Sequence, residues 1–428
     1  MGFEPQAAFR EAAIAWSRAD PARVIFLCRA ILERVPDFPD ALNLLGVALH
    51  SSGDREAALG TLQRAAAIVH RPDILNNLGL ALRSLKNTDE ALDAFLAAIA
   101  VDENFAEAQA NIGRLLCETG NQAGALKHLL RAVAVKPDLQ RPHSDLGAVY
   151  MKLNRLELAT RHYEESLILG LSRWQPTGAF LDSRATEPEP DPVNEAAAAS
   201  RLARFRAGLI AMKRVLDDAG ITFFLGDGTA LGCTREKAFI SYDKDVDLGI
   251  DAAVPRSRVL QALDESSEFW IDPERESRNG EVLICGSYRN LVAIDLFFYH
   301  YVDGYVWHGI RHGNEETRWR QTPFGLAPVD FIGENYLIPA DTDRYLTELY
   351  DNWRLPDPDY SPYVTGDIVG GLPLMAKCYA LRDLQMALGA GKPAKAAAIA
   401  RRLIDRLHLY DPSPRLAAAL AAFLARSR

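Results

Sequence analysis

The segment Phe223–Asp251 reads FFLGDGTALGCTREKAFISYDKDVDLGID. From Asp245 onwards acidic and apolar residues alternate, which is the pattern of a half-buried strand. Because successive side chains of a strand point to opposite faces, Asp245 and Asp247 share one face and the hydrophobic residues between them face the core. Adjacent carboxylates repel each other unless a cation lies between them, and oxygen ligands of this kind suit Mg²⁺ or Mn²⁺. The segment predicts a metal site, and an exposed acidic edge is the alternative.

The residues before these aspartates favour a phosphate ligand. Gly228 and Thr229 follow an apolar run and open a short helix-compatible segment. Backbone N–H groups at the start of a helix can bind a diphosphate, and the Thr229 hydroxyl would add a donor. Arg235 and Lys237 follow and would neutralise phosphate charge. The segment therefore predicts a combined metal and nucleotide site.

A further acidic residue, Asp295, stands alone in the apolar run VAIDLFFYH. A buried carboxylate without a partner is costly, so we expect Asp295 to face a cation or a base. We interpret it as a third metal ligand beside Asp245 and Asp247, and a salt bridge to Arg289 or Arg311 is the alternative.

Three histidines near this run are predicted to be structural. Strand alternation puts His300 on the face opposite Asp295, and His308 and His312 flank a predicted loop.

Length and composition restrict the classes of protein. A chain of 428 residues, 48% hydrophobic and 25% charged, is expected to form two or three globular domains. Its net charge of −9 argues against general nucleic-acid binding, which needs clustered Lys and Arg. The five cysteines are scattered, and no apolar run approaches the roughly 20 residues of a membrane-spanning helix. The N-terminus lacks the apolar segment of a signal peptide, so a cytoplasmic location is expected.

The first 170 residues contain an internal repeat of 33 or 34 residues. Glycines recur at Gly46, Gly79, Gly113 and Gly147, and small residues follow at Ala58, Ala91, Ala125, Ala159, Ala65, Ala98, Ala132 and Ser166. This spacing resembles the tetratricopeptide repeat, in which two helices pack closely at small residues. We predict an all-α solenoid over residues 1–170, with four clear repeats and an N-terminal cap.

Such a solenoid has a concave groove that commonly binds a peptide or a protein partner. Polar residues on the first helices of the repeats are candidates for lining it: Asn43, Asn76, Asn77, Asn111 and His143. Docking of a protein partner or of the acceptor is our prediction, and a solenoid that only supports or dimerises the second domain is the alternative.

The pattern after the repeats predicts three more segments. Residues 171–200 contain the run EPEPDP and are predicted to be an extended linker. Residues 201–365 alternate predicted helices and strands, and residues 366–428 are Ala-rich with helical periodicity. The predicted fold class is multidomain: an all-α repeat solenoid, an α+β domain and C-terminal helices.

The α+β part, residues 205–360, resembles the LicD/fukutin-type phosphotransferases, which have a nucleotidyltransferase-like fold. Three blocks in order carry the resemblance: GTALG with Arg235 and YDKDVD at 242–247, IDLF at 294–297, and a late group with IP at 338–339, YL at 345–346, LYDNW at 349–353 and Pro356. The family commonly has Pro-Trp where this chain has Ser241-Tyr242, and Tyr-Gly-Asp-Trp where this chain has Tyr350 to Trp353.

The resemblance implies transfer of a phosphocholine or phospho-alditol group from a CDP-linked donor to a hydroxyl of a glycan or glycoprotein acceptor. It implies that Asp245, Asp247 and Asp295 hold Mg²⁺ or Mn²⁺, and that Asp295 accepts the proton of the acceptor hydroxyl. Tyr242 would stack on the cytosine base or, alternatively, belong to the core. Asp243 would position the loop or the water of a second metal ion.

Two other functions remain open from the sequence. A nucleotidyltransferase would attack the α-phosphate of a nucleoside triphosphate and release pyrophosphate. An adaptor would use the repeats alone and carry a catalytically silent second domain.

Overall fold

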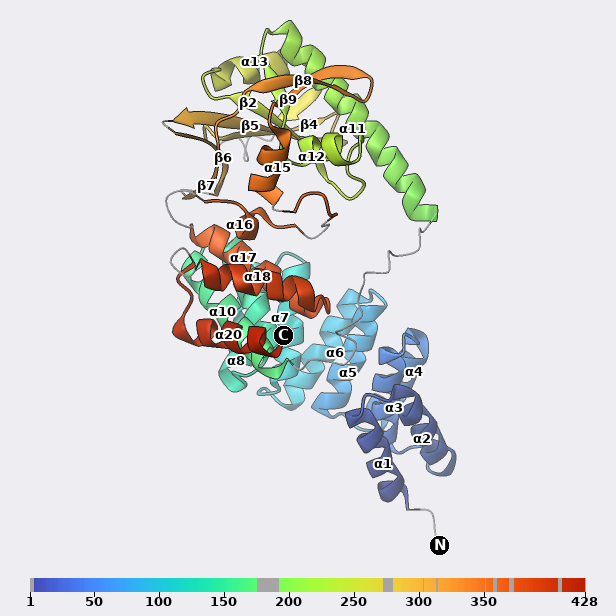
Figure 1. Ribbon diagram of the computed structural model, residues 1–428. Helices are drawn as coiled ribbons and strands as arrows, with labels where there is room; N and C mark the ends of the chain where they lie inside the picture. Colours follow the sequence, from blue (N-terminus) through green and yellow to red (C-terminus); the bar gives the residue numbers. More distant parts are fainter. Residues whose placement is uncertain are drawn as a thin grey trace. The chain divides into compact units, whose positions relative to one another are not determined.

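The computed structural model describes residues 4–174, 192–271, 280–302, 304–312, 315–350, 352–356, 360–368, 373–406 and 410–427 (Figure 1). The chain divides into two compact units, Met1–Arg173 and Trp174–Arg428. Most of the predicted linker lies outside the described residues, as does Asp351 of the late sequence block. No helix of the described part is both long and apolar enough to span a bilayer.

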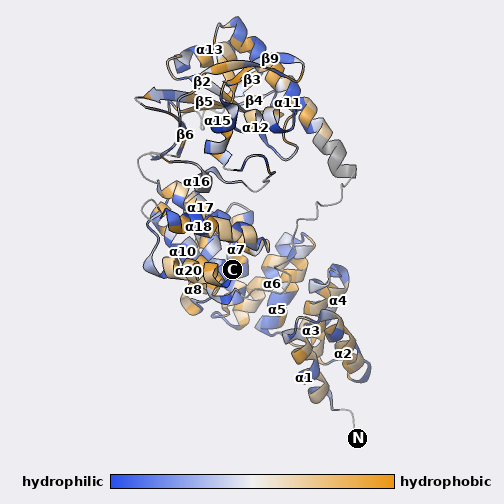
Figure 2. Ribbon diagram, viewed as in Figure 1, coloured by the Kyte–Doolittle hydropathy of each residue, from blue (hydrophilic) through white to orange (hydrophobic). Residues whose placement is uncertain are grey.

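The described part of the first unit consists of helices in antiparallel pairs. Their bounds are α1 (Pro5–Ser17), α2 (Pro21–Arg34), α3 (Pro39–Ser51), α4 (Arg55–Ile68), α5 (Pro72–Ser84), α6 (Thr88–Val101), α7 (Ala106–Glu118), α8 (Gln122–Val135), α9 (Gln140–Lys152) and α10 (Leu156–Arg173). Figure 2 shows hydrophobic and hydrophilic residues alternating along these helices, as expected where one face of each helix is buried.

Each repeat places its glycine against a large side chain of the next helix. A Cβ on Gly79 would lie 2.5 Å from the Phe95 ring, and the same contact recurs at Gly46 with Leu62, Gly113 with Leu129 and Gly147 with Tyr163. The alanines predicted to be small packing positions, such as Ala91 and Ala98, are completely buried. The predicted all-α repeat solenoid is confirmed.

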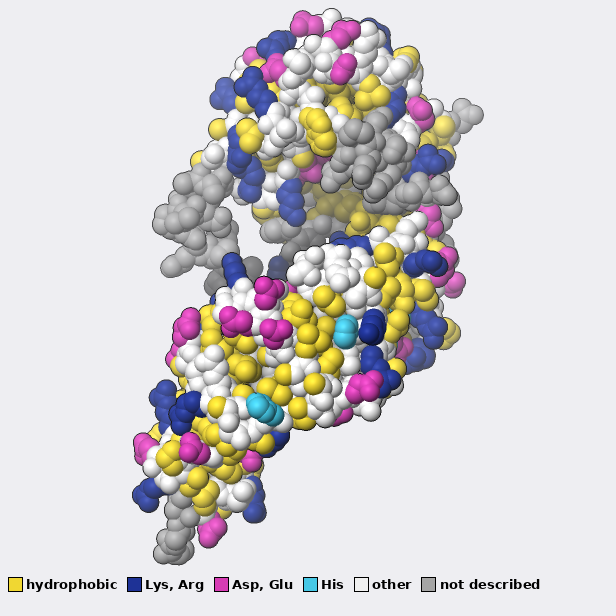
Figure 3. Space-filling view, turned by 180° about the vertical axis from the view of Figure 1, so that it is seen from behind, with side chains coloured by type: hydrophobic (Ala, Val, Ile, Leu, Met, Phe, Trp, Pro, Cys, Tyr) yellow, Lys and Arg dark blue, Asp and Glu magenta, His cyan; other side chains and the backbone are white. Residues whose placement is uncertain are grey.

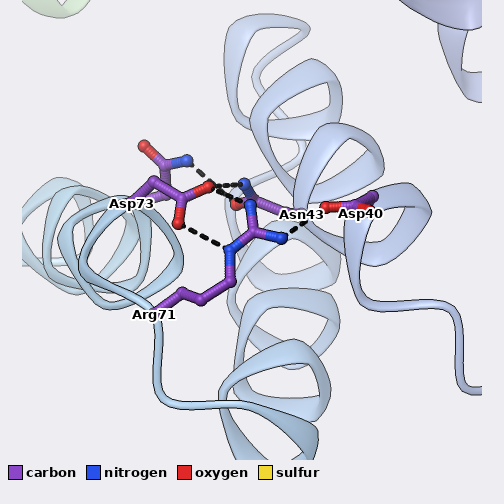
Figure 4. A network of polar contacts seen from close by, with 5 residues as sticks. Asp40, Asn43, Arg71 and Asp73 are labelled. Carbon is purple, nitrogen blue, oxygen red and sulfur yellow. Dashed lines mark hydrogen bonds and ion pairs between the residues drawn. The ribbon is translucent and has the colours of Figure 1, made fainter. Parts of the chain in front are cut away.

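The asparagines predicted to line the groove hydrogen-bond to one another between repeats. Asn77 Nδ2 donates to Asn43 Oδ1 at 2.9 Å, and Asn111 Nδ2 donates to Asn76 Oδ1 at 2.8 Å. Beside Asn43, Arg71 bonds Asp40 and Asp73, as Figure 4 shows. These side chains therefore join neighbouring repeats.

One face of the molecule carries hydrophobic and charged side chains side by side (Figure 3). In the space-filling view, hydrophobic side chains lie between groups of Lys or Arg and groups of Asp or Glu (Figure 3). Exposed hydrophobic residues of the first unit include Phe26, Leu96 and Val101. Exposed hydrophobic residues of this kind are normal for a protein surface.

A mixed sheet forms the centre of the second unit. Its strands are β1 (Phe223–Leu225), β2 (Asp245–Asp251), β3 (Phe269–Ile271), β4 (Leu283–Tyr288), β5 (Val292–Val302), β6 (Tyr305–His312) and β7 (Glu315–Gln321). The order is β1-β2-β5-β4-β3, and β6 and β7 extend the sheet from the end of β5. In the described sheet, β2 and β5 pair in parallel and the other pairs are antiparallel. A separate hairpin joins β8 (Leu326–Phe331) and β9 (Glu334–Pro339).

Helices complete the core around this sheet. α11 (Pro192–Asp218) packs against β2, β5 and α13 (Arg256–Ser266), and α12 (Asp227–Arg235) packs between β2 and α15 (Thr342–Tyr350). Hydrophobic residues of β2 and β5 form the centre of this core, and Val246, Leu248 and Ile294 are completely buried.

The C-terminal helices attach to β7. They are α16 (Pro362–Thr365), α17 (Leu374–Gly389), α18 (Pro393–Asp405) and α20 (Pro414–Arg426). Trp319 Nε1 of β7 donates to the carbonyl of Pro362 at 3.0 Å, and Glu315 accepts the backbone N–H of Met375 at 3.1 Å. The predicted α+β domain with a helical tail is confirmed.

Candidate active site

Three carboxylates converge at the start of β2. Among the described residues, Asp243, Asp245 and Asp247 each offer an oxygen, and these oxygens all lie within 4.8 Å of one another. Asp245 and Asp247 occupy alternate positions of β2, and the intervening Val246 is completely buried. The strand places both carboxylates on one face, as the alternation of residues predicts.

The environment of the three carboxylates disfavours their charge. Burial and the neighbouring Asp245 raise the pKa of Asp243 to about 7. Burial also raises the pKa of Asp245, and burial together with the surrounding carboxylates raises the pKa of Asp247 well above its ordinary value. An all-oxygen set whose charges repel one another fits a hard divalent cation such as Mg²⁺ or Mn²⁺.

The N-terminus of α12 is directed at this cluster. The N–H of Gly228 donates to Asp247 Oδ2 at 3.0 Å, and the N–H of Asp227 donates to the Tyr345 hydroxyl at 3.1 Å. The helix start therefore stabilises the carboxylate of Asp247, which differs from the predicted use of these N–H groups for phosphate. Gly228 leaves space for the carboxylates, because a Cβ there would lie 2.6 Å from Asp243 Oδ2 and 2.9 Å from Asp247 Oδ2 and would force them to move.

Thr229 forms a hydrogen bond with the backbone of β2. Its side chain is 2% exposed, and its Oγ1 accepts the backbone N–H of Asp247 at 2.9 Å. The hydroxyl thus fixes the position of Asp247, and this geometry does not support the prediction that Thr229 binds phosphate.

The carboxylates line a cavity of about 730 Å³. Most of the predicted site residues are among the described residues of its wall: Gly228, Arg235, Tyr242, Asp243, Asp245, Asp247 and Asp295. Thr229 and Lys237 are not among them. Aromatic residues form much of the remaining wall, including Trp319, Tyr350, Trp353 and Tyr360.

The two predicted phosphate-binding cations have other positions. The guanidinium of Arg235 donates to the carbonyl of Trp353 and the hydroxyl of Tyr242, both at 3.1 Å, and it pairs with Glu236. Lys237 is exposed and has a positive φ of 55°. Arg235 therefore stabilises the cavity wall through these bonds. The geometry does not support phosphate binding by Lys237.

Asp295 lies beside Asp247 because β2 and β5 are parallel. The two residues are partners in the register of the strands, so their side chains leave the same face. Asp295 lines the cavity and contributes to the raised pKa of Asp247. The set of mutually close oxygens, however, contains Asp243 as its third member.

His308 lies in the same cavity, which sequence reasoning missed. It lies within β6, opposite Trp319 of β7, and its ring stacks on Tyr299 with the centroids 4.5 Å apart. It is 3% exposed, and its Nε2 lies 3.5 Å from Asp227 Oδ1. The available signal was the alternating pattern of Glu315–Gln321, which predicts a further strand. A strand there pairs with β6 and extends it beyond His308, so that His308 lies within the sheet.

The cavity also receives cations that the sequence did not indicate. Lys244 lies in the loop before β2, and Lys395 and Arg402 come from α18. The presence of Lys395 and Arg402 in this wall depends on how the C-terminal helices fold back, which local patterns do not predict.

Family models match both units. Residues 220–341 match the LicD/FKTN/FKRP nucleotidyltransferase domain, and tetratricopeptide-repeat models match residues 41–73, 72–105 and 105–136.

Curated relatives match shorter parts of the chain. The ribitol-5-phosphate transferase FKTN of Mus musculus and that of Homo sapiens are each 25% identical over 146 residues, 33% of this chain and 32% of theirs. The chain thus spans about a third of the length of these relatives. The protein O-mannosyl-transferase TMTC3 of Homo sapiens is 36% identical over 78 residues, 18% of this chain and 8% of its own length.

Solved structures with some likeness include the crystal structure of MamA, with a TM-score of 0.33 and 19% identity over 37% of this chain and 93% of that one. Pseudomonas aeruginosa PilF has a TM-score of 0.36 and 19% identity over 39% of this chain and 82% of its own. The models and the described fold agree: tetratricopeptide repeats at residues 41–136 are followed by a LicD/FKTN-type nucleotidyltransferase domain at residues 220–341.

Proposed function

We propose that this protein is a metal-dependent phosphotransferase. It moves a phosphocholine or phospho-alditol group from a CDP-linked donor to a hydroxyl of a glycan or glycoconjugate. The observation that carries the proposal is the convergence of Asp243, Asp245 and Asp247 in a cavity of about 730 Å³. Similarity to curated ribitol-5-phosphate transferases supports this class of reaction.

Asp243, Asp245 and Asp247 would hold Mg²⁺ or Mn²⁺, with Asp295 as an additional carboxylate at its side. When bound, such a cation neutralises phosphate charge and stabilises the CMP leaving group. The N–H of Gly228 orients Asp247 for this role through its bond to Oδ2.

Other residues of the cavity bind and orient the substrates. Tyr242 is 36% exposed and its hydroxyl is held by Arg235, so its ring is available to stack on the cytosine base. Asp295 accepts the proton of the attacking hydroxyl on a carboxylate oxygen. Trp319, Tyr350 and Trp353 exclude water from the reacting groups.

We further propose that the tetratricopeptide repeats bind a protein partner or a protein-linked acceptor. Solenoids of this kind present an extended concave surface, and that general use supports the proposal.

The test measures CMP release from CDP-choline, CDP-glycerol and CDP-ribitol with Mg²⁺ or Mn²⁺. We expect Asp247→Asn to lower the rate on the order of 100-fold or more, since changes even in the outer shell of a metal site cost 10- to 100-fold. Asp264→Asn is the control, because Asp264 is an exposed acidic residue of α13.

Two results would reject the proposal. Release of pyrophosphate from CTP, without CMP release from any CDP-linked donor, would indicate a nucleotidyltransferase. Equal rates in wild type and Asp247→Asn would show that the carboxylates are not catalytic.

A further inference from the structure

A nucleoside diphosphate needs cations to bind its phosphate oxygens. The two residues predicted to supply them, Arg235 and Lys237, either bond other groups or lie outside the described cavity wall. The side chain of Arg235 is only 10% exposed, and its guanidinium bonds Trp353, Tyr242 and Glu236. Lys237 is exposed and is not among the described residues of the cavity wall. The cations that bind phosphate must therefore include others.

Helix α18 presents one face to the cavity. Lys395, Ala398, Ile399 and Arg402 line the wall, and their spacing of three or four residues puts them on the same side of the helix. Lys395 and Arg402 lie two turns apart, about 10 Å along the axis. Ala398 and Ile399 lie between the two cations on this face.

The position of α18 is fixed by contacts around α16. Just after α18, Arg406 Nη1 donates to the carbonyl of Gly366 at 2.6 Å. Trp319, which lines the cavity from β7, donates to the carbonyl of Pro362 at 3.0 Å. The carboxylates and the cations of α18 thus line the same cavity within the second unit.

The charge distribution selects the chemistry of the ligand. Asp243, Asp245, Asp247 and Asp295 contribute acidic groups to the cavity, and α18 contributes cations. A nucleoside diphosphate complements both, because its oxygens bind a divalent cation on one side and Lys or Arg on the other. Arg402 also lines a second cavity of about 670 Å³, together with Arg320 and Arg406.

We propose that Lys395 and Arg402 bind the phosphate oxygens of the nucleotide donor, so that α18, outside the matched residues 220–341, completes the donor site. The inference rests on the proposed function for the identity of the donor. A phosphorylated acceptor offers the same oxygens, and the test below separates the two sources.

The test is calorimetric binding of CDP in the presence of Mn²⁺ to the full-length protein, without acceptor. We expect Arg402→Gln and Lys395→Gln to weaken CDP binding about 10-fold or more, because each removes a charge-assisted hydrogen bond. Arg401→Gln and Lys392→Gln are matched controls, since both residues are exposed on the same segment and should leave CDP affinity within about 2-fold of wild type.

Two further measurements make the result specific. Mn²⁺ affinity without nucleotide should be unchanged in Arg402→Gln, which shows that the carboxylates are intact. Arg402→Lys retains the charge and should recover part of the affinity for CDP.

Unchanged CDP affinity in both α18 variants would overturn the inference. A loss confined to the KM of a phosphorylated acceptor would overturn it as well, and would assign the cations to that substrate. If CDP binds through Arg402 but wild type releases no CMP from any donor, the inference stands and the proposed function fails. If wild type binds no nucleoside diphosphate, both fail.

Discussion

Gly228 leaves room for two carboxylates that a side chain would displace. Its N–H orients Asp247, and the space in front of its Cα is occupied by oxygens of Asp243 and Asp247. One residue thus supplies both a hydrogen-bond donor and the room that the cluster requires.

Gly228→Ala should therefore remove metal binding while leaving the fold intact. The new Cβ would lie 2.6 Å from Asp243 Oδ2, closer than real contacts of this kind, whereas alanine itself is favourable in a helix. We expect Mn²⁺ to raise the thermal midpoint of wild type and to have little effect on the variant.

Gly325→Ala is the control for this change, because a Cβ at Gly325 meets no atom within 4 Å. A Mn²⁺-dependent shift of equal size in Gly228→Ala and wild type would contradict the assignment of the cluster.

The same cluster makes stability depend on pH. Burial and neighbouring carboxylates raise the pKa of Asp243 to about 7 and also raise the pKa of Asp247, and burial raises the pKa of Asp245. In the unfolded chain these groups have a pKa of about 3.9. Between these values the folded, metal-free protein holds more protons than the unfolded chain, so its free energy of unfolding falls as pH rises.

A bound divalent cation takes the place of these protons, so its stabilising effect should grow over the same range. We expect the increase in thermal midpoint at a fixed Mn²⁺ concentration to be larger near pH 7.5 than near pH 5.5. An increase that does not vary with pH would show that the carboxylates are ionised throughout.

At the scale of elements, close packing of helix pairs depends on the repeated glycines. α5 packs close to α6 because Gly79 has no side chain that would collide with Phe95. The other three repeats have the same contact between a glycine and a large side chain. The first helices are additionally joined by asparagine pairs such as Asn43 with Asn77.

Gly79→Ala and Gly60→Ala should therefore change stability in opposite directions. At Gly79 a Cβ would lie 2.5 Å from the Phe95 ring, and such overpacking costs about 1–3 kcal/mol. At Gly60, within α4, a Cβ meets nothing within 4 Å, and alanine should stabilise by about 0.5–1 kcal/mol.

Thermal unfolding of the full chain, followed by circular dichroism of the helices, compares the two variants with wild type. Shifts of the same sign in both variants would show that the glycine contact does not control packing of the repeats.

At the scale of the whole molecule, the sequence predicts elements better than it predicts the direction of single side chains. Four repeats in register predict the solenoid, since the glycine and the small residues of each repeat recur at the same places. The alternation around Asp245 and Asp247 predicts a strand with two carboxylates on one face, and the structure contains it.

Local patterns could not predict contacts between distant segments. Arg235 bonds the carbonyl of Trp353, 118 residues away, and this tertiary contact determines where its guanidinium lies. The contribution of Lys395 and Arg402 depends on how the C-terminal helices return to the sheet. Asp243 precedes β2, so strand alternation gave no reason to group its oxygens with those of Asp245 and Asp247.

The contact between Gly46 and Leu62 recurs at Gly79 and Phe95, at Gly113 and Leu129, and at Gly147 and Tyr163, always between residues sixteen positions apart. Both halves of the contact therefore belong to one repeat and are copied together when a gene segment of that length is duplicated. An array built in this way can gain or lose whole repeats during evolution without new compensating substitutions at this contact. Selection can then adjust the number of repeats separately from the chemistry of the LicD/FKTN-type domain.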